Sequence, residues 1–234
     1  TIEETAFSKT PLESFSIPSS LVDLEDGWSF NTSRLNSISV SPNNPRYKMY
    51  DNFIFIGKSN VDSNEYDTIC FCCRNVKTVK IPKFIKHIDS CSFNHCEQLR
   101  SVEIPFDSQL QTIGFHSFSR SAIEKISFPP HLTEIGQSSF EGCEKLRIVD
   151  IPQNSELQKI DNCSFNGCPI KSFSFTSQIK GDANYLFDFC TQLQIIEFDE
   201  ISNVKLYSLD SIKRCDPLLM TPAKIKKHFS EKFF

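Results

Sequence analysis

Residues 132–152 read LTEIGQSSFEGCEKLRIVDIP, and this stretch decides the fold because its spacing recurs along the chain. Seven apolar positions precede Pro152 at intervals of 3, 5, 3, 3, 3 and 2 residues: Leu132, Ile135, Phe140, Cys143, Leu146, Val149 and Ile151. The same intervals separate Ile85, Ile88, Phe93, Cys96, Leu99, Val102 and Ile104, ahead of Pro105. Self-similarity of this kind is the signature of a repeat architecture.

The repeat extends over most of the chain. Its last apolar slot recurs every 22–24 residues, with a single step of 41, at positions 17, 40, 81, 104, 128, 151, 175, 198 and 220. The final copy, at 201–220, keeps the intervals but has degraded residue types. Ile2 and Phe7 are spaced like Ile135 and Phe140, so we expect a fragment of a longer array or an unusual first turn. We therefore predict a single array of about eight or nine turns over 1–222, followed by a basic and aromatic tail at 223–234.

Local periodicity within the unit predicts short strands. Val149 and Ile151 alternate with Asp150, which is the period of a strand. A short strand that returns every 22–24 residues suits a solenoid, in which each turn lays its strand parallel to the previous one. The segment GQSSFEGCEK predicts one turn of α- or 3₁₀-helix, and the preceding LTEI predicts an extended segment on the opposite side.

One repeat slot explains the excess of phenylalanine, which accounts for 22 of the 234 residues. We predict an interior ladder between the two walls of the solenoid, made of Phe7, Phe93, Phe118, Phe140, Phe165 and Phe187. Cysteine fills the slot three residues later at Cys96, Cys143, Cys168 and Cys190. Cysteine in a repeating slot is most simply a small core residue.

The cysteines also allow two other interpretations. Equivalent slots in neighbouring turns lie about 5 Å apart, within the Cα range of a disulfide, so that pairs such as Cys143 with Cys168 are conceivable. Cys70 and Cys73 have the C-x₂-C spacing of zinc ligands. They fall in the phenylalanine and cysteine slots of the repeat, which favours the core, and we expect neither a metal nor a cofactor.

The long step of 41 residues hides an insertion of about 18 residues within 43–70. Aromatic residues flank Asp51 and Asn52, and both of these residue types tolerate a positive φ. The insertion therefore predicts a tight hairpin between Tyr47 and Phe55, followed by a polar loop from Ser59 to Asp67.

The unit L-x-x-I-x-x-x-x-F-x-x-C-x-x-L-x-x-I-x-I-P resembles the BspA-type leucine-rich repeat, and residues 132–152 match it almost position by position. The segment from Asn44 to Phe55 also resembles an insertion found in that family. The resemblance implies a right-handed leucine-rich repeat solenoid with a parallel sheet on its concave face. It also implies binding rather than catalysis, in proteins found on the surfaces of host-associated bacteria and in some anaerobic protists.

Charge and motifs exclude several classes of function. The net charge of −4 and a pI of about 5.8 argue against a nucleic-acid partner. No G-x-S-x-G, H-E-x-x-H, P-loop or G-x-G-x-x-G motif occurs, so we expect a protein that is not an enzyme. No apolar run is long enough to span a bilayer, and the first residues lack the pattern of a signal peptide. The resemblance favours a secreted or cell-surface protein, while an intracellular scaffold or adaptor in the cytoplasm stays open, as does the oligomeric state.

The outward-facing strand positions suggest where a protein ligand binds. Arginine is enriched at protein interfaces, and exposed isoleucine is unusual on a solvated strand. We predict a contact patch for a host, matrix or neighbouring-cell protein, called the docking patch below, made of Arg100, Arg147, Ile148, Lys171 and Ile195.

Overall fold

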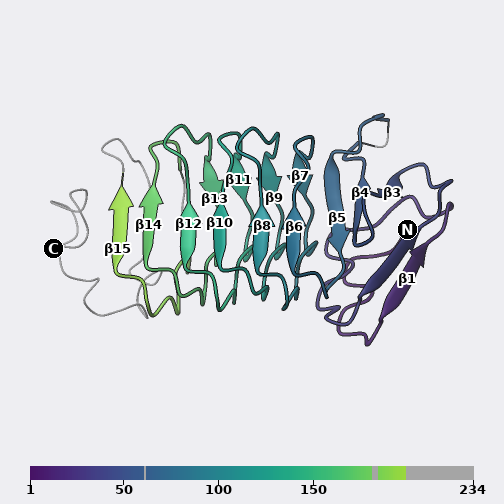
Figure 1. Ribbon diagram of the computed structural model, residues 1–234, viewed down its shortest axis with the longest axis horizontal. Coiled ribbons are helices and arrows are strands. Elements are labelled where there is room, and N and C mark those ends of the chain that lie inside the picture. Colours follow the sequence, from purple (N-terminus) through teal and green to yellow (C-terminus); the bar gives the residue numbers. More distant parts are fainter. Residues whose placement is uncertain (61, 181–183, 199–234) are drawn as a thin grey trace.

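The computed structural model describes residues 1–60, 62–180 and 184–198, and these residues wind into an elongated β-solenoid (Figure 1). A full turn of the solenoid has three sides: a first side with a strand in every turn, a second side with strands in turns 3 to 7, and a third side made of loops. We number the turns 1 to 8 by the strand that each contributes to the first side. The predicted solenoid with parallel strands is confirmed.

The first side carries one parallel strand from every turn, and its outer surface is called the strand face below. Its strands are β1 (Ser14–Ile17), β2 (Ser37–Val40), β6 (Thr78–Lys80), β8 (Ser101–Glu103), β10 (Lys125–Ser127), β12 (Ile148–Asp150), β14 (Ser172–Phe175) and β15 (Ile195–Phe198). Equivalent repeat positions pair in register, as in Thr78 with Ser101 and Lys125 with Ile148. The strands of successive turns lie side by side along the solenoid (Figure 1). Because they pair in register, residues in the same slot form columns.

The second side confirms that the segments before the phenylalanine are extended. Its parallel strands are β5 (Thr68–Cys72), β7 (His87–Ile88), β9 (Thr112–Ile113), β11 (Glu134–Ile135) and β13 (Lys159–Ile160). Their isoleucines point inward and are buried, whereas Glu134 and Lys159 lie on the outer surface. Alternation on both sides thus encloses one apolar interior.

The third side corrects the prediction of a helical turn, because no helix is present in the described residues. Its repeating element, called the Phe loop below, runs from two residues before the phenylalanine slot to two residues after it. Every positive φ of the described residues falls at one of these two ends, as at Ser138 and Gly142 around Phe140. Each loop keeps one turn bond between residues three apart, such as the Glu141 amide to the Ser138 carbonyl at 3.1 Å, and the left-handed residue at each end prevents its continuation as a helix.

The Phe loops bond to one another instead. The amides of Ser138, Phe140 and Gly142 donate to the carbonyls of Asn162, Ser164 and Asn166 in the next turn, at 2.8–2.9 Å. The same three bonds join turns 4 to 5, 5 to 6 and 7 to 8. This third hydrogen-bond ladder offsets the cost of the left-handed conformations, which is about 1 kcal/mol for each non-glycine residue.

The phenylalanine slot forms a stack through the middle of the solenoid. The rings of Phe93 and Phe118 have centroids 4.7 Å apart, those of Phe118 and Phe140 are 5.2 Å apart, and those of Phe140 and Phe165 are 5.3 Å apart. The ring planes lie within 7° of parallel. The thiol of Cys168 donates to the carbonyl of Phe140 at 3.0 Å, so the cysteine column bonds to the phenylalanine column beside it.

The insertion is a hairpin, as predicted. β3 (Tyr47–Met49) pairs antiparallel with β4 (Ile54–Gly57), and the Asp51 carboxylate caps the turn by accepting from the amides of Phe53 and Ile54. β4 then pairs with β5, so two extra strands widen the second side between turns 2 and 3. The buried Asn44 side chain anchors the start of the hairpin to turn 2 by donating to the carbonyls of Pro18 and Leu21.

Turn 3 also lacks a Phe loop, which corrects the assignment of Cys70 to the phenylalanine slot. Cys73 follows Ile69 by four positions, whereas Cys96 follows Ile88 by eight. The Phe loops of turns 2 and 4 therefore meet directly, and the Asn31 amide donates to Oδ1 of Asn94. Two strands are added on one side and a loop is missing on another. Turns 1 and 2 are consequently inclined to the rest of the array (Figure 1).

The buried guanidinium of Arg74 fills the space left by the missing loop. It is 2% exposed and donates to the carbonyls of Ser92 at 2.8 Å, Cys91 at 3.1 Å and Ser29 at 3.4 Å. It also lies over the Phe71 ring, 4.3 Å from the centroid. One side chain therefore replaces part of a backbone ladder.

Two predicted segments, the degraded turn at 201–220 and the tail at 223–234, lie outside the described residues.

Candidate binding surface

The strand face aligns outward-facing side chains of every turn, from β1 to β15. The position before each strand forms a first column, which contains Lys77, Arg100, Glu124, Arg147, Lys171 and Gln194. Backbone bonds fix this alignment, since the Arg100 amide donates to the Lys77 carbonyl and the Arg147 amide to the Glu124 carbonyl. All six side chains are exposed.

The first strand residue forms a second column, in which two large apolar side chains face solvent. Ile148 is 49% exposed and Ile195 is 43% exposed. They occupy turns 6 and 8. Ser172 of turn 7 lies between them in the column and is the strand partner of Ile195. These isoleucines are the outward members of strands whose inward residues, such as Ile196, are buried. The array does not need them for its core.

A third column carries three carboxylates, two of which form ion pairs with lysines of the sheet. The Glu103 carboxylate accepts from Nζ of Lys80 at 2.6 Å, and Asp150 pairs with Lys125 at 2.6 Å. The hydrogen bond from Lys125 holds the pKa of Asp150 below its usual range. Glu197 accepts from the Ser174 hydroxyl at 3.2 Å. Glu103 and Asp150 are therefore compensated by lysines, whereas Glu197 has only a hydroxyl partner among the described residues.

The structure brings four of the five docking-patch residues together. Arg147, Ile148, Lys171 and Ile195 occupy turns 6, 7 and 8. Arg100 lies two turns away from Arg147 in the same column, with Glu124 between them. The docking patch is thus a compact group of four residues with one outlying cation.

The structural ladder residues lie inside the solenoid and not at a surface. All are fully buried: Phe93, Phe118, Phe140, Phe165, Cys96, Cys143 and Cys168. The nine cysteines of the described residues are free thiols. Burial raises the pKa of Cys168 well above its usual value, which keeps this thiol protonated as a donor. In the described part of the chain, no group of three potential metal-binding side chains comes together.

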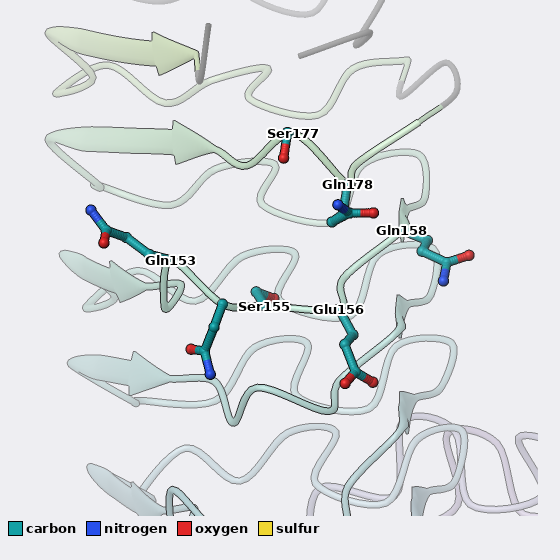
Figure 2. Close-up of a pocket in the computed structure, with 7 residues that line it drawn as sticks. Gln153, Ser155, Glu156, Gln158, Ser177 and Gln178 are labelled. Carbon is teal, nitrogen blue, oxygen red and sulfur yellow. The ribbon is translucent and has the colours of Figure 1, made fainter. Parts of the chain in front are cut away.

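A polar hollow of about 260 Å³ lies beyond the strand face, in the loops after β12 and β14 (Figure 2). Amide and hydroxyl side chains of two consecutive turns line it, and Gln153 and Gln158 point away from one another (Figure 2). Glu156 is its single carboxylate and contacts His131 at 3.1 Å. The lining contains no pair of groups suited to acid–base catalysis.

A second hollow of about 540 Å³ follows from the repeat itself. Turn 5 is one residue shorter after its phenylalanine, and Ala122 of this turn lies between Glu97 and Glu144 of the longer turns beside it. Arg120 and Lys145 also line the hollow. Because charges of both signs alternate there, the lining favours no single class of ligand.

A further set of exposed aromatic side chains, two of them in the hairpin, was not predicted from the sequence. Tyr50 and Phe84 meet edge to face with centroids 5.9 Å apart, and Phe53 and Phe106 are also exposed. The signal was present in the sequence, since Phe84 and Phe106 follow the strand-ending prolines Pro82 and Pro105 and occupy no core slot.

Within the described residues, no helical segment has the length and hydropathy that a bilayer span requires.

Comparison with solved structures supports the fold. The pneumococcal vaccine antigen PcpA aligns with 65% of this chain at 19% identity and a TM-score of 0.55, and the chain spans 50% of its length. A leucine-rich repeat protein from Eubacterium ventriosum aligns with 85% of the chain at 18% identity and a TM-score of 0.53, and the chain spans 61% of it. The T. pallidum leucine-rich repeat protein aligns with 62% at 24% identity and a TM-score of 0.52, over 68% of its own length.

Comparison with protein families gives the identity of the repeat. No curated protein matches the chain. The family described as "BspA type Leucine rich repeat region" matches in six copies, over residues 1–121, 63–194 and 111–227. The chain therefore belongs to the BspA-type leucine-rich repeat family.

Proposed function

We propose that this chain is a non-enzymatic module that binds a protein partner through the docking patch on its strand face. The observation that carries the proposal is the position of exposed Ile148 and Ile195 beside Arg147 and Lys171. Apolar side chains that fill no core slot, next to arginine, are typical of protein interfaces. The short strands make this surface rigid, so a partner binds it without a large ordering cost.

A photo-crosslinking experiment tests this surface. Benzoylphenylalanine replaces Ser172, between the two isoleucines, or Gln178, in the polar hollow, as the matched control. Extract and intact cells of the source organism and its host provide the partners. We expect a discrete protein adduct from position 172 that disappears in Arg147→Glu combined with Ile148→Asp. Equal adducts from both positions, or adducts unaffected by the double variant, would contradict the proposal.

We further propose that the module acts at the cell surface, in adhesion to a host, matrix or neighbouring-cell protein. Membership of the family and the likeness to a pneumococcal vaccine antigen support this location. Protease treatment of intact cells tests it, because Lys58 opens the polar loop that follows the hairpin. Peptides released from intact cells support a surface role, and release only after lysis contradicts it.

An intracellular scaffold is the second candidate, favoured by the nine free thiols. Disulfides are rare in reducing compartments and common outside the cell. A thiol titration of denatured native material separates the two candidates. A value near the full complement of 10 cysteines supports the scaffold, and several disulfides contradict it.

A further inference from the structure

The charges of the strand face fall into two columns that are neutralised to different degrees. Two carboxylates of the third column are paired with lysines of the sheet, Glu103 with Lys80 and Asp150 with Lys125. From turn 3 to turn 7, the first column contains four cations and one acid: Lys77, Arg100, Glu124, Arg147 and Lys171. Within the described residues, none of these four cationic side chains has an ion pair or a side-chain hydrogen bond. The first column thus presents uncompensated positive charge.

This positive charge is a local property of the strand face. The chain as a whole has a net charge of −4, so its long-range field does not attract acidic partners. Equivalent slots lie about 5 Å apart along the array, which places Arg100 and Arg147 about 10 Å apart. The screening length at physiological salt is about 8 Å, so the electrostatic field of these cations decays close to the strand face. A partner therefore senses this column only on contact.

The two exposed isoleucines indicate that the partner also presents apolar groups. Arg147 and Lys171 immediately precede Ile148 and Ser172 in the sequence, so the cations border the apolar column on one side. Covering an exposed isoleucine contributes about 25 cal/mol for each Å² of apolar surface removed from water. A ligand that supplied only negative charge would leave both isoleucines in water.

We infer that the partner presents an acidic and apolar protein segment to this face, with carboxylates against the first column and aliphatic or aromatic side chains over Ile148 and Ile195. This inference rests on the proposed function and names the chemistry of its ligand. Guanidinium groups bind carboxylates in a bidentate manner, which suits Arg100 and Arg147. A nucleic acid fits less well, because its phosphates would meet the first column but leave Ile148 and Ile195 in water.

Synthetic peptides of about twelve residues, labelled with a fluorophore, test the inference by anisotropy on the full chain. One peptide alternates Glu and Leu, and the matched probes alternate Gln and Leu, Glu and Ser, or Lys and Leu. We expect the Glu–Leu peptide to bind about tenfold more tightly than each of the others. Its affinity should fall about tenfold between about 50 mM and about 500 mM NaCl.

Matched variants locate the binding. Arg147→Glu should weaken the Glu–Leu peptide about tenfold, whereas Lys159→Glu makes the same charge change on the second side and should alter binding less than about twofold. Equal binding of the Gln–Leu and Glu–Leu peptides, or equal effects of the two variants, would overturn the inference. Tighter binding of a thymidine dodecamer than of the Glu–Leu peptide would overturn it in favour of a polyanion.

The two proposals fail separately. If crosslinks from position 172 persist while no peptide preference exists, the strand face remains the binding surface and the acidic class of partner is wrong. If the crosslinks from position 172 are also absent, both the acidic class of partner and the proposed function are wrong.

Discussion

Backbone groups on the third side find hydrogen-bond partners in two different ways. One operates in the regular array of turns 4 to 7, and the other at the junction between turns 2 and 4. In the array, each Phe loop satisfies the next through three backbone bonds, and the rings stack within 7° of parallel. At the junction one loop is missing, Trp28 and Phe71 pack at 41°, and Arg74 supplies the donors. Repetition makes stability a sum of similar contacts. Where the Phe loop is missing, the side chain of Arg74 supplies much of the stabilisation.

The largest expected effect breaks the stack in the array. Phe140→Ala removes a fully buried ring between Phe118 and Phe165 and should lower the free energy of unfolding by about 3–5 kcal/mol, measured by urea denaturation. Phe106→Ala is the control, because this ring is 67% exposed and its loss should cost less than about 0.5 kcal/mol. Similar losses in the two variants would argue against an interior stack.

The next effect breaks the junction. Arg74→Met keeps much of the side-chain volume but leaves the carbonyls of Cys91 and Ser29 without their guanidinium donor. We expect a loss of about 2–4 kcal/mol. Hydrogen exchange should rise in 27–31 and 91–95 and stay unchanged around Phe140. The control is Arg34→Met, an exposed arginine paired with Glu13, which should cost less than about 1 kcal/mol. Faster exchange along the whole array would contradict a local role for Arg74.

The junction should also make the stability of the protein depend on pH. At the junction, burial and the nearby carboxylate of Asp26 raise the pKa of Asp89 to about 7. The folded protein keeps this proton up to about pH 7, whereas the unfolded chain releases it near pH 4, so stability should fall as the pH rises between these values. The expected loss is about 1–4 kcal/mol between about pH 4 and about pH 8, by urea denaturation.

Asp89→Asn removes this titration and should flatten the pH profile, because the amide carries no charge to bury. The matched control is Asp161→Asn, which occupies the same corner in turn 7 and should keep the wild-type slope. A wild-type slope in Asp89→Asn would show that other groups cause the pH dependence.

The smallest expected change in stability comes from breaking an ion pair on the strand face. Asp150→Asn breaks the exposed pair with Lys125 and should cost less than about 1 kcal/mol, because water screens both groups. The difference from wild type should shrink further in about 1 M NaCl. A larger, salt-independent loss would mean that the third column supports the fold and not only the surface.

The sequence predicted most of the array because one spacing encodes each turn. The strand at Val149, the extended segment at Ile135 and the ring at Phe140 follow from apolar periodicity, and the hairpin follows from Asp51 and Asn52 between aromatic runs. The helical turn was wrong because left-handed conformations at Ser138 and similar residues leave no signal in residue type.

The junction was not predictable in the same way. The spacing of four residues from Ile69 to Cys73 signals a missing loop, but nothing local indicates that Arg74 would be buried without a carboxylate in the described part of the chain. For the candidate surface, the repeat register predicts which residues share a column. Ion pairing between the columns, which leaves Arg100 and Arg147 uncompensated, depends on side-chain reach and emerges only from the structure.

The central claim is that the array is a scaffold and the strand face is the functional surface. The most direct test measures the affinity of the protein crosslinked at position 172 for two variants of the full chain. Arg147→Glu with Ile148→Asp should weaken binding at least about tenfold and leave the urea midpoint unchanged. Phe140→Leu should lower the midpoint and leave the affinity of the folded protein unchanged. The reverse pattern, with affinity lost in Phe140→Leu and kept in the surface variant, would contradict the account.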